Sequence, residues 1–413
     1  MNEVLPYQDT RKAWIPVLGA FFVHFLTIGT EKAFSVWFVE IMDVFHSSAS
    51  TTSGILGLNS SMRLLLGPIA VMLSSIFGLQ IVVICGGFLS LLGLAICSIT
   101  RSFVILVIGY SFVFGMFFSS TQTSSLGLGL TLVFTPSLLV CTTYFKKKRS
   151  IALSLSLTGA GFGAFALPTL VSYLIKQFGY HGAMLINSSI LFHFCVSGAL
   201  YYPLPDETNE TDQIIQSELR KNRAINKFKT QLQCGSLLND KWFMIFVSGF
   251  IFNMMGSVPV TTLIVDNAIT QGVSCKLAYS LAIQIPKEKA ISLLAIEGVF
   301  QVISRLASGF LFGVERFHRI RGFIWCSVIL CSALIIYFIG LVKNFYAFAV
   351  IMALRGCFLA IYIAQQTLIT TDMVEGFHSH VNQAIGLTQF SKGVGTLIGS
   401  YLSGEQHITF EIM

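Results

Sequence analysis

Long apolar runs separated by short polar stretches dominate the pattern along this chain of 413 residues. A helix needs about 20 consecutive apolar residues to cross the hydrocarbon core of a bilayer. Runs of about that length recur along the chain, so the pattern predicts an all-α polytopic membrane protein. The predicted spans, about eleven in number, are 14–38, 54–77, 80–99, 103–142, 150–175, 180–201, 242–264, 290–312, 322–341, 345–368 and 383–404.

The fourth apolar run, 103–142, is too long for a single span. About forty helical residues would extend about 60 Å, roughly twice the thickness of the hydrocarbon core. The middle of the run, SSTQTSSLGLG at 119–129, is polar. We expect this middle to interrupt the run as a bend, a re-entrant stretch or an inserted segment.

One long polar stretch, from Pro203 to Lys241, divides the chain. It contains DETNETDQ followed by ELRKNRAINKFK, which is typical of a solvated linker with a short basic helix. The pattern therefore predicts three parts: a six-helix bundle at 1–202, a central loop at 203–241 and a second bundle at 242–413. Two bundles joined by such a loop are typical of secondary transporters.

Composition excludes several classes of protein. Hydrophobic residues make up 54% of the chain and charged residues only 11%, against roughly 25% charged residues in soluble domains. A soluble enzyme or a nucleic-acid binder is therefore excluded. The nine cysteines form no CxxC pair, and the chain contains no HExxH, GxSxG or Walker A motif, so we expect no enzyme activity, catalytic residue, metal site or cofactor.

The net charge of +7 predicts orientation, because cytoplasmic loops carry an excess of Lys and Arg. With the N-terminus inside, fifteen of the 26 basic residues fall in cytoplasmic segments, six fall outside and five lie within spans. The cytoplasmic basic residues are Arg11, Lys12, Lys146, Lys147, Lys148, Arg149, Arg220, Lys221, Arg223, Lys227, Lys229, Lys241, Arg316, Arg319 and Arg321. We therefore expect the N-terminus and the central loop to be cytoplasmic.

Two motifs resemble those of monocarboxylate transporters, a solute carrier branch of the major facilitator superfamily. The stretch YFKKKRSIALSLSLTGAGFG at 144–163 resembles the second family signature: an aromatic pair, a basic run, then small residues leading to glycines. The stretch from Asp9 to Trp14 resembles the entry motif, although two glycines of that motif are missing. The signature residues are Trp14, Tyr144, Phe145, Lys146, Arg149, Gly159, Gly161 and Gly163.

The resemblance implies twelve helices in two bundles. It also implies movement of monocarboxylates or related small organic solutes by alternating access at the plasma membrane, either passive or as proton-linked symport. Implied partners are a small organic anion or zwitterion, protons, the lipid bilayer and a single-span glycoprotein chaperone, with no nucleic acid. The sequence departs from the family pattern in ending after the eleventh predicted span, so we expect the second bundle, as given, to lack the last helix. It also carries extra stretches near 116–126 and 275–286.

Charges within spans are the candidate site, because a charge at the bilayer centre costs at least ~2.5–3.5 kcal/mol. Arg305 can bind a carboxylate bidentately, and it matches the substrate-binding Arg of the family. Glu297, Gln301 and Arg305 are four residues apart and share one helix face. Gln301 replaces the family's acid and cannot take a proton, which leaves Glu297 as the candidate proton-coupling residue.

Lys32 matches a family lysine that contacts the substrate carboxylate. The resemblance therefore implies that Lys32, like Gln301 and Arg305, is a substrate-binding residue. Arg63, Arg355 and Lys392 are candidate cavity residues. Two alternatives stay open. Gln301 favours a proton-independent facilitator of a zwitterionic or neutral solute of the creatine, carnitine or aromatic amino acid type. The missing helix and the extra stretches favour a truncated, transport-incompetent membrane protein.

Overall fold

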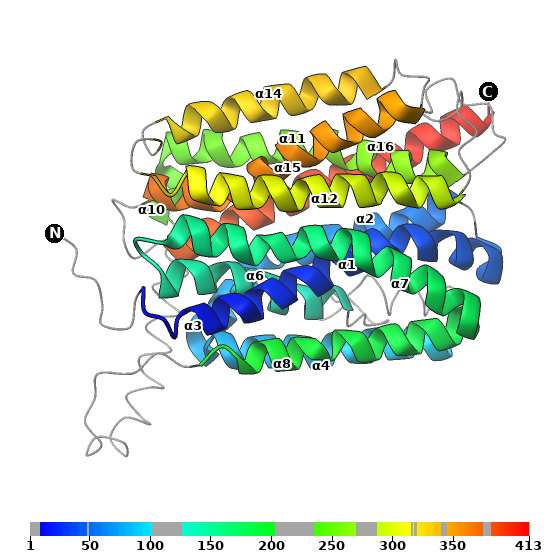
Figure 1. Ribbon diagram of the computed structural model, residues 1–413, viewed down its shortest axis with the longest axis horizontal. Helices are drawn as coiled ribbons and strands as arrows, with labels where there is room; N and C mark the ends of the chain where they lie inside the picture. The colour runs from blue at the N-terminus through cyan, green and yellow to red at the C-terminus, as the bar shows by residue number, and fades with distance from the viewer. Residues whose placement is uncertain are drawn as a thin grey trace.

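The computed structural model describes residues 9–47, 49–100, 126–202, 235–269, 287–314, 317, 320–339, 345–374 and 381–412. Every regular element within these ranges is a helix, and the long helices lie roughly side by side (Figure 1). The helices are α1 (Trp14–Phe45), α2 (Ala49–Leu65), α3 (Gly67–Phe77), α4 (Leu79–Ile99), α6 (Leu126–Tyr144), α7 (Arg149–Leu191), α8 (His193–Ala199), α10 (Gly235–Asn239), α11 (Lys241–Ile269), α12 (Lys287–Leu311), α14 (Arg321–Ile339), α15 (Phe345–Val374) and α16 (Val381–Ile412).

The described helices have the inverted polarity of a membrane protein. Large apolar side chains such as Phe252 and Phe323 are more than 70% exposed, while Arg305 and Gln365 are buried. Four described helices are long and apolar enough to cross a membrane, or five if the bent pair α2–α3 counts as one span. The fold class is therefore that of an all-α polytopic membrane protein, and the count of eleven spans stays a prediction.

Two helix breaks follow from local sequence. The axis bends by 45° between α2 and α3, where Pro68 occupies the first turn of α3. Proline has no backbone N–H and its ring clashes with the preceding turn, which kinks a helix. Within α7, Gly179 has φ 66° and ψ −178°, which breaks the helix at that residue. The ribbon of α7 doubles back before it reaches α8 (Figure 1). The break lies between the predicted spans 150–175 and 180–201.

Helix packing brings together segments that are far apart in the chain. The helix α1 packs against α7, and α4 packs against α6. In the C-terminal part, α12 packs against α15, and α11 against α16. Two further contacts join helices that precede residues 203–234 in the chain to helices that follow them. The helix α7 packs against α12, and α2 packs against α16.

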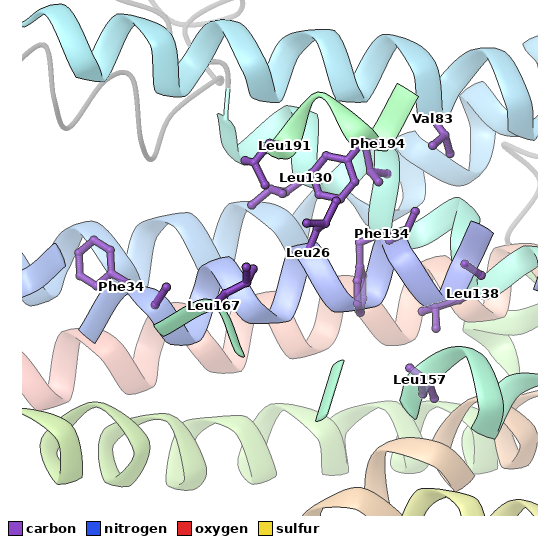
Figure 2. Packing of buried hydrophobic residues seen from close by; sticks show 14 of the residues in the cluster. Leu26, Phe34, Val83, Leu130, Phe134, Leu138, Leu157, Leu167, Leu191 and Phe194 are labelled. Carbon is purple, nitrogen blue, oxygen red and sulfur yellow. The ribbon is translucent and has the colours of Figure 1, made fainter. Parts of the chain in front are cut away.

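Buried apolar side chains fill the space between the N-terminal helices. Figure 2 shows Leu26 of α1 among Leu130 of α6, Leu191 of α7 and Phe194 of α8. All four residues are at most 5% exposed. These contacts fix α1 against three neighbouring helices and so set the positions of the polar side chains that α1 carries.

The glycines of the second signature set the spacing of three helices. A Cβ atom on Gly159 or Gly163 would overlap the carbonyl oxygen of Phe21 or Phe25 on α1. A Cβ atom on Gly161 would meet Val302 of α12. Small residues allow helix backbones to approach closely, so these alternating glycines let α7 fit between α1 and α12.

Several predicted features lie wholly or mostly outside the described residues. They are the break at 119–129, the central loop at 203–241 and the extra stretches at 116–126 and 275–286. The helix α6 begins at Leu126, within the predicted break. The division into three parts, 1–202, 203–241 and 242–413, stays a prediction.

Candidate functional site

The two signature motifs meet at the N-terminal end of α1. The carboxylate of Asp9 accepts hydrogen bonds from the backbone N–H groups of Lys147 and Lys148, both at 3.0 Å. The rings of Trp14 and Phe145 lie 4.9 Å apart. Arg149 Nε donates to the carbonyl of Phe145 at 3.2 Å. The motifs therefore join the start of α1 to the turn between α6 and α7, which is a structural role.

Arg305 begins a chain of hydrogen bonds along one face of α12. Its Nη2 donates to Gln301 Oε1 at 3.0 Å, and Gln301 Nε2 donates to Glu297 Oε1 at 3.0 Å. Its Nη1 donates to the carbonyl of Leu157 on α7 at 2.5 Å. The predicted alignment of the three side chains on one face is confirmed by these bonds. Arg305 is 1% exposed, and its Nε has no partner within the described residues.

Glu297 is the acid at the other end of this chain. Its Oε2 pairs with Arg355 Nη1 of α15 at 3.3 Å, and Lys32 of α1 also acts on it electrostatically. A Cβ atom on Gly356 would lie 2.6 Å from the carbonyl oxygen of Glu297, so α15 and α12 touch at this level. Arg355 is thus an ion-pair partner as well as a candidate cavity residue. Both oxygens of Glu297 are engaged, so a proton on Oε2 would compete with Arg355.

A second ion pair involves Arg63 of α2. Its Nη2 contacts Glu31 Oε2 at 2.8 Å, and the hydroxyl of Ser60 donates to Glu31 Oε1 at 2.9 Å. The guanidinium carbon lies 4.6 Å from the centroid of the Phe134 ring. Sequence reasoning missed this pair because Glu31 and Arg63 lie on different helices, and no local spacing links them.

Neutralising Glu31 should destabilise the protein, because it would leave Arg63 buried without its counter-charge. Breaking a buried ion pair costs about 3–5 kcal/mol, and we expect the lower end because the Glu31 side chain is 27% exposed. Glu31→Gln should therefore lower the melting temperature of the purified protein. The double variant Glu31→Gln/Arg63→Met should recover much of the loss. The exposed acid Asp43 on the same helix is the control: if Asp43→Asn and Glu31→Gln melt alike, the pair is not stabilising.

Two further buried basic side chains lie near this group. Lys392 of α16 is 3% exposed, and its Nζ lies 5.1 Å from the centroid of the Phe250 ring. His24 of α1 is fully buried, and its Nε2 is 3.3 Å from the hydroxyl oxygen of Ser137. Sequence reasoning missed His24, although a histidine inside an apolar run is a detectable signal. It also missed the pairing of Arg321 with Asp372, having assigned Arg321 to a cytoplasmic basic cluster.

The charges of this group do not balance. The group has five positive side chains, the half-buried Lys32 and the buried Arg63, Arg305, Arg355 and Lys392. It has two negative side chains, the half-buried Glu31 and the buried Glu297. Unpaired charge inside a membrane protein is costly and marks solute pathways. The helices α1, α2, α12, α15 and α16 together therefore form a buried, net positive site that can attract and hold an anion.

A helical membrane protein with buried charges between its helices has the architecture of a solute transporter. The family model of the Major Facilitator Superfamily matches residues 20–400. The chain belongs to this superfamily, and it is a multi-pass membrane transporter.

Curated relatives point to one branch of the superfamily. Monocarboxylate transporter 12 of Xenopus laevis is 24% identical over 96% of this chain and 83% of its own length. Human monocarboxylate transporter 14 is 33% identical over 50% of this chain and 38% of its own length. Monocarboxylate transporter 13 of Bos taurus is 32% identical over 48% of this chain and 43% of its own length.

Proposed function

We propose that this protein moves small organic solutes carrying a carboxylate across the plasma membrane by alternating access, with its N-terminus and central loop in the cytoplasm. The observation that carries the proposal is Arg305. It is a buried guanidinium that donates hydrogen bonds to the neutral oxygens of Leu157 and Gln301. No carboxylate among the described side chains lies within ion-pair distance of it. A substrate carboxylate would supply the missing counter-charge.

The other charged side chains have complementary roles in this proposal. Lys32 lies on α1, and Arg305 lies on α12, which belongs to the other part of the chain. A carboxylate that contacts both side chains would hold these two helices together. Such differential contact is what a substrate needs to shift the balance between two conformations of a transporter.

Proton coupling in this proposal rests on Glu297. Gln301 cannot take a proton, and its Nε2 donates a hydrogen bond to Glu297 Oε1 at 3.0 Å. Protonation of Glu297 would compete with its ion pair to Arg355. We propose that substrate and proton enter together, with the incoming carboxylate drawing Arg355 or Lys32 away from Glu297.

A second candidate function is proton-independent movement of a zwitterion. Glu31 and Glu297 place two negative charges among the basic side chains. Such acids can hold the cationic end of a zwitterion while Arg305 holds its carboxylate. In that case Glu297 would stay ionised throughout the transport cycle.

Uptake of labelled lactate, pyruvate, creatine, carnitine and aromatic amino acids into expressing cells tests the proposal. We expect carboxylate uptake to rise as the outside pH falls, and Glu297→Gln should flatten this pH profile. Uptake with a flat profile in the wild type would favour the zwitterion facilitator. No uptake of any solute by protein at the cell surface would contradict both functions and favour a transport-incompetent membrane protein.

A further inference from the structure

Lys392 is a buried ammonium of the charged group to which the proposed contacts of a monocarboxylate, with Arg305 and Lys32, assign no partner. It is 3% exposed, and its Nζ lies over the face of the Phe250 ring, 5.1 Å from the ring centroid. No carboxylate among the described side chains lies within ion-pair distance of it. A cation–π contact recovers only part of the hydration that an ammonium loses on burial. Lys392, like Arg305, therefore has no carboxylate counter-charge among the described side chains.

Lys392 belongs to the same group of charges as Arg305. The rings of His24 and Phe134 lie 5.3 Å apart, and the Arg63 guanidinium lies 4.6 Å from the centroid of the same Phe134 ring. A Cβ atom on Gly393, the neighbour of Lys392, would lie 2.5 Å from the backbone N of Leu65, two residues after Arg63. Arg305 donates to Leu157 of α7, and Gly159, two residues later, packs against Phe21 and Phe25 of α1, which lie on either side of His24 in the sequence. Thus side chains from α12, α1, α2 and α16 surround one region. A single carboxylate on Arg305 would leave an excess of two positive charges in this region, and a second carboxylate would lower the excess to one.

Buried amide groups without hydrogen-bond partners among the described residues lie on α15 and α16. Gln365 is fully buried, and both its Oε1 and its Nε2 lack a partner within the described residues. The contact of Gly356 with Glu297 sets the register of α15 against α12. Gln365 lies nine residues after Gly356 on α15, and Arg305 lies eight residues after Glu297 on α12. The two side chains therefore lie at about the same depth. Gln389 Oε1 is also unpaired, and Gln389 lies one turn before Lys392. Buried polar groups without partners are rare in proteins and call for a ligand or water.

We propose that this site takes a small organic dianion, with one carboxylate on Arg305 and the second acidic group on Lys392. The inference rests on the proposed function, and it names the substrate class of the same site. Gln365 and Gln389 would donate to, or accept from, polar groups between the two carboxylates. Because Arg305 and Lys392 lie on different helices, a two-headed anion would connect α12 to α16 through its own carbon chain.

Matched pairs of acids test the inference. Butyrate and succinate have the same carbon count and differ by one carboxylate, and glutarate and adipate extend the spacing. In the wild-type full chain, a dicarboxylate of the favoured length should compete for uptake about tenfold more strongly than butyrate, which corresponds to about 1.4 kcal/mol. Ligand-induced shifts in melting temperature of the purified protein should follow the same order.

Variants of Lys392 separate binding from folding. Lys392→Met should lower dicarboxylate affinity about tenfold and butyrate affinity by a much smaller factor, because it removes one charge-assisted contact that only a second carboxylate makes. Lys392→Arg keeps the charge and should keep most of the dicarboxylate preference. The control is Lys176→Met, since Lys176 is an exposed lysine on α7 outside the charged group.

Two results would overturn this inference and leave the proposed function standing. In the first, butyrate is taken up as well as every dicarboxylate. In the second, Lys392→Met weakens the binding of both kinds of acid equally. The second result would make Lys392 a structural residue. Uptake of neither kind of acid by protein at the cell surface would overturn the proposed function and this inference with it.

Discussion

Arg305→Lys is expected to lower kcat/KM for a carboxylate substrate by roughly tenfold to a hundredfold, although it keeps the positive charge. A guanidinium offers a carboxylate two parallel hydrogen bonds, and an ammonium cannot reproduce that fork. A hydrogen bond to a charged group is worth about 1.5–3 kcal/mol, which converts to this range of rates. Arg305→Ala should abolish transport, since it removes both the fork and the charge.

The measurement is initial uptake over a range of substrate concentrations, corrected for protein at the cell surface. Arg305 also donates to Leu157 and Gln301, so the melting temperature of each purified variant must be recorded. Arg11→Lys is the matched control, because Arg11 is exposed and lies before α1. Wild-type kcat/KM in a well-folded Arg305→Lys variant would show that Arg305 does not hold the carboxylate.

Gly163→Ala is expected to lower the melting temperature strongly and to reduce the amount of protein at the cell surface. Its methyl group would overlap the carbonyl oxygen of Phe25 on α1. Overpacking typically costs about 1–3 kcal/mol, and we expect at least the upper end because the obstacle is backbone, which cannot rotate away. Gly159→Ala should behave in the same way against Phe21.

Gly249→Ala is the matched control for this prediction. Gly249 lies in α11, and a Cβ atom there would meet nothing within 4 Å. Alanine is favoured over glycine in a helix by about 1 kcal/mol, so this variant should melt at the wild-type temperature or above. If Gly163→Ala and Gly249→Ala melt alike, α7 does not depend on the close approach to α1.

The fold could be predicted from the sequence to a large extent because the bilayer imposes a simple rule. Backbone groups inside a membrane must be satisfied within the helix, so long apolar runs indicate helices and their approximate limits. The run predicted at 242–264 corresponds to α11 at Lys241–Ile269, and that at 322–341 corresponds to α14 at Arg321–Ile339. Helix breaks were less visible: Pro68 bends the predicted span 54–77 through a local steric clash.

The candidate site, like the fold, could be predicted from the sequence only where it depends on local spacing. The face of α12 that carries Glu297, Gln301 and Arg305 follows from the helical repeat of 3.6 residues, which is a local property of the sequence. By itself the sequence determined this face, the membrane class and the small residues at Gly159, Gly161 and Gly163. Only the tertiary structure decided that Glu31 pairs with Arg63, that Glu297 pairs with Arg355, and that Lys392 lies over Phe250 and His24 against Phe134. Those contacts join different helices, and ion pairing depends on distances in space that chain spacing does not encode.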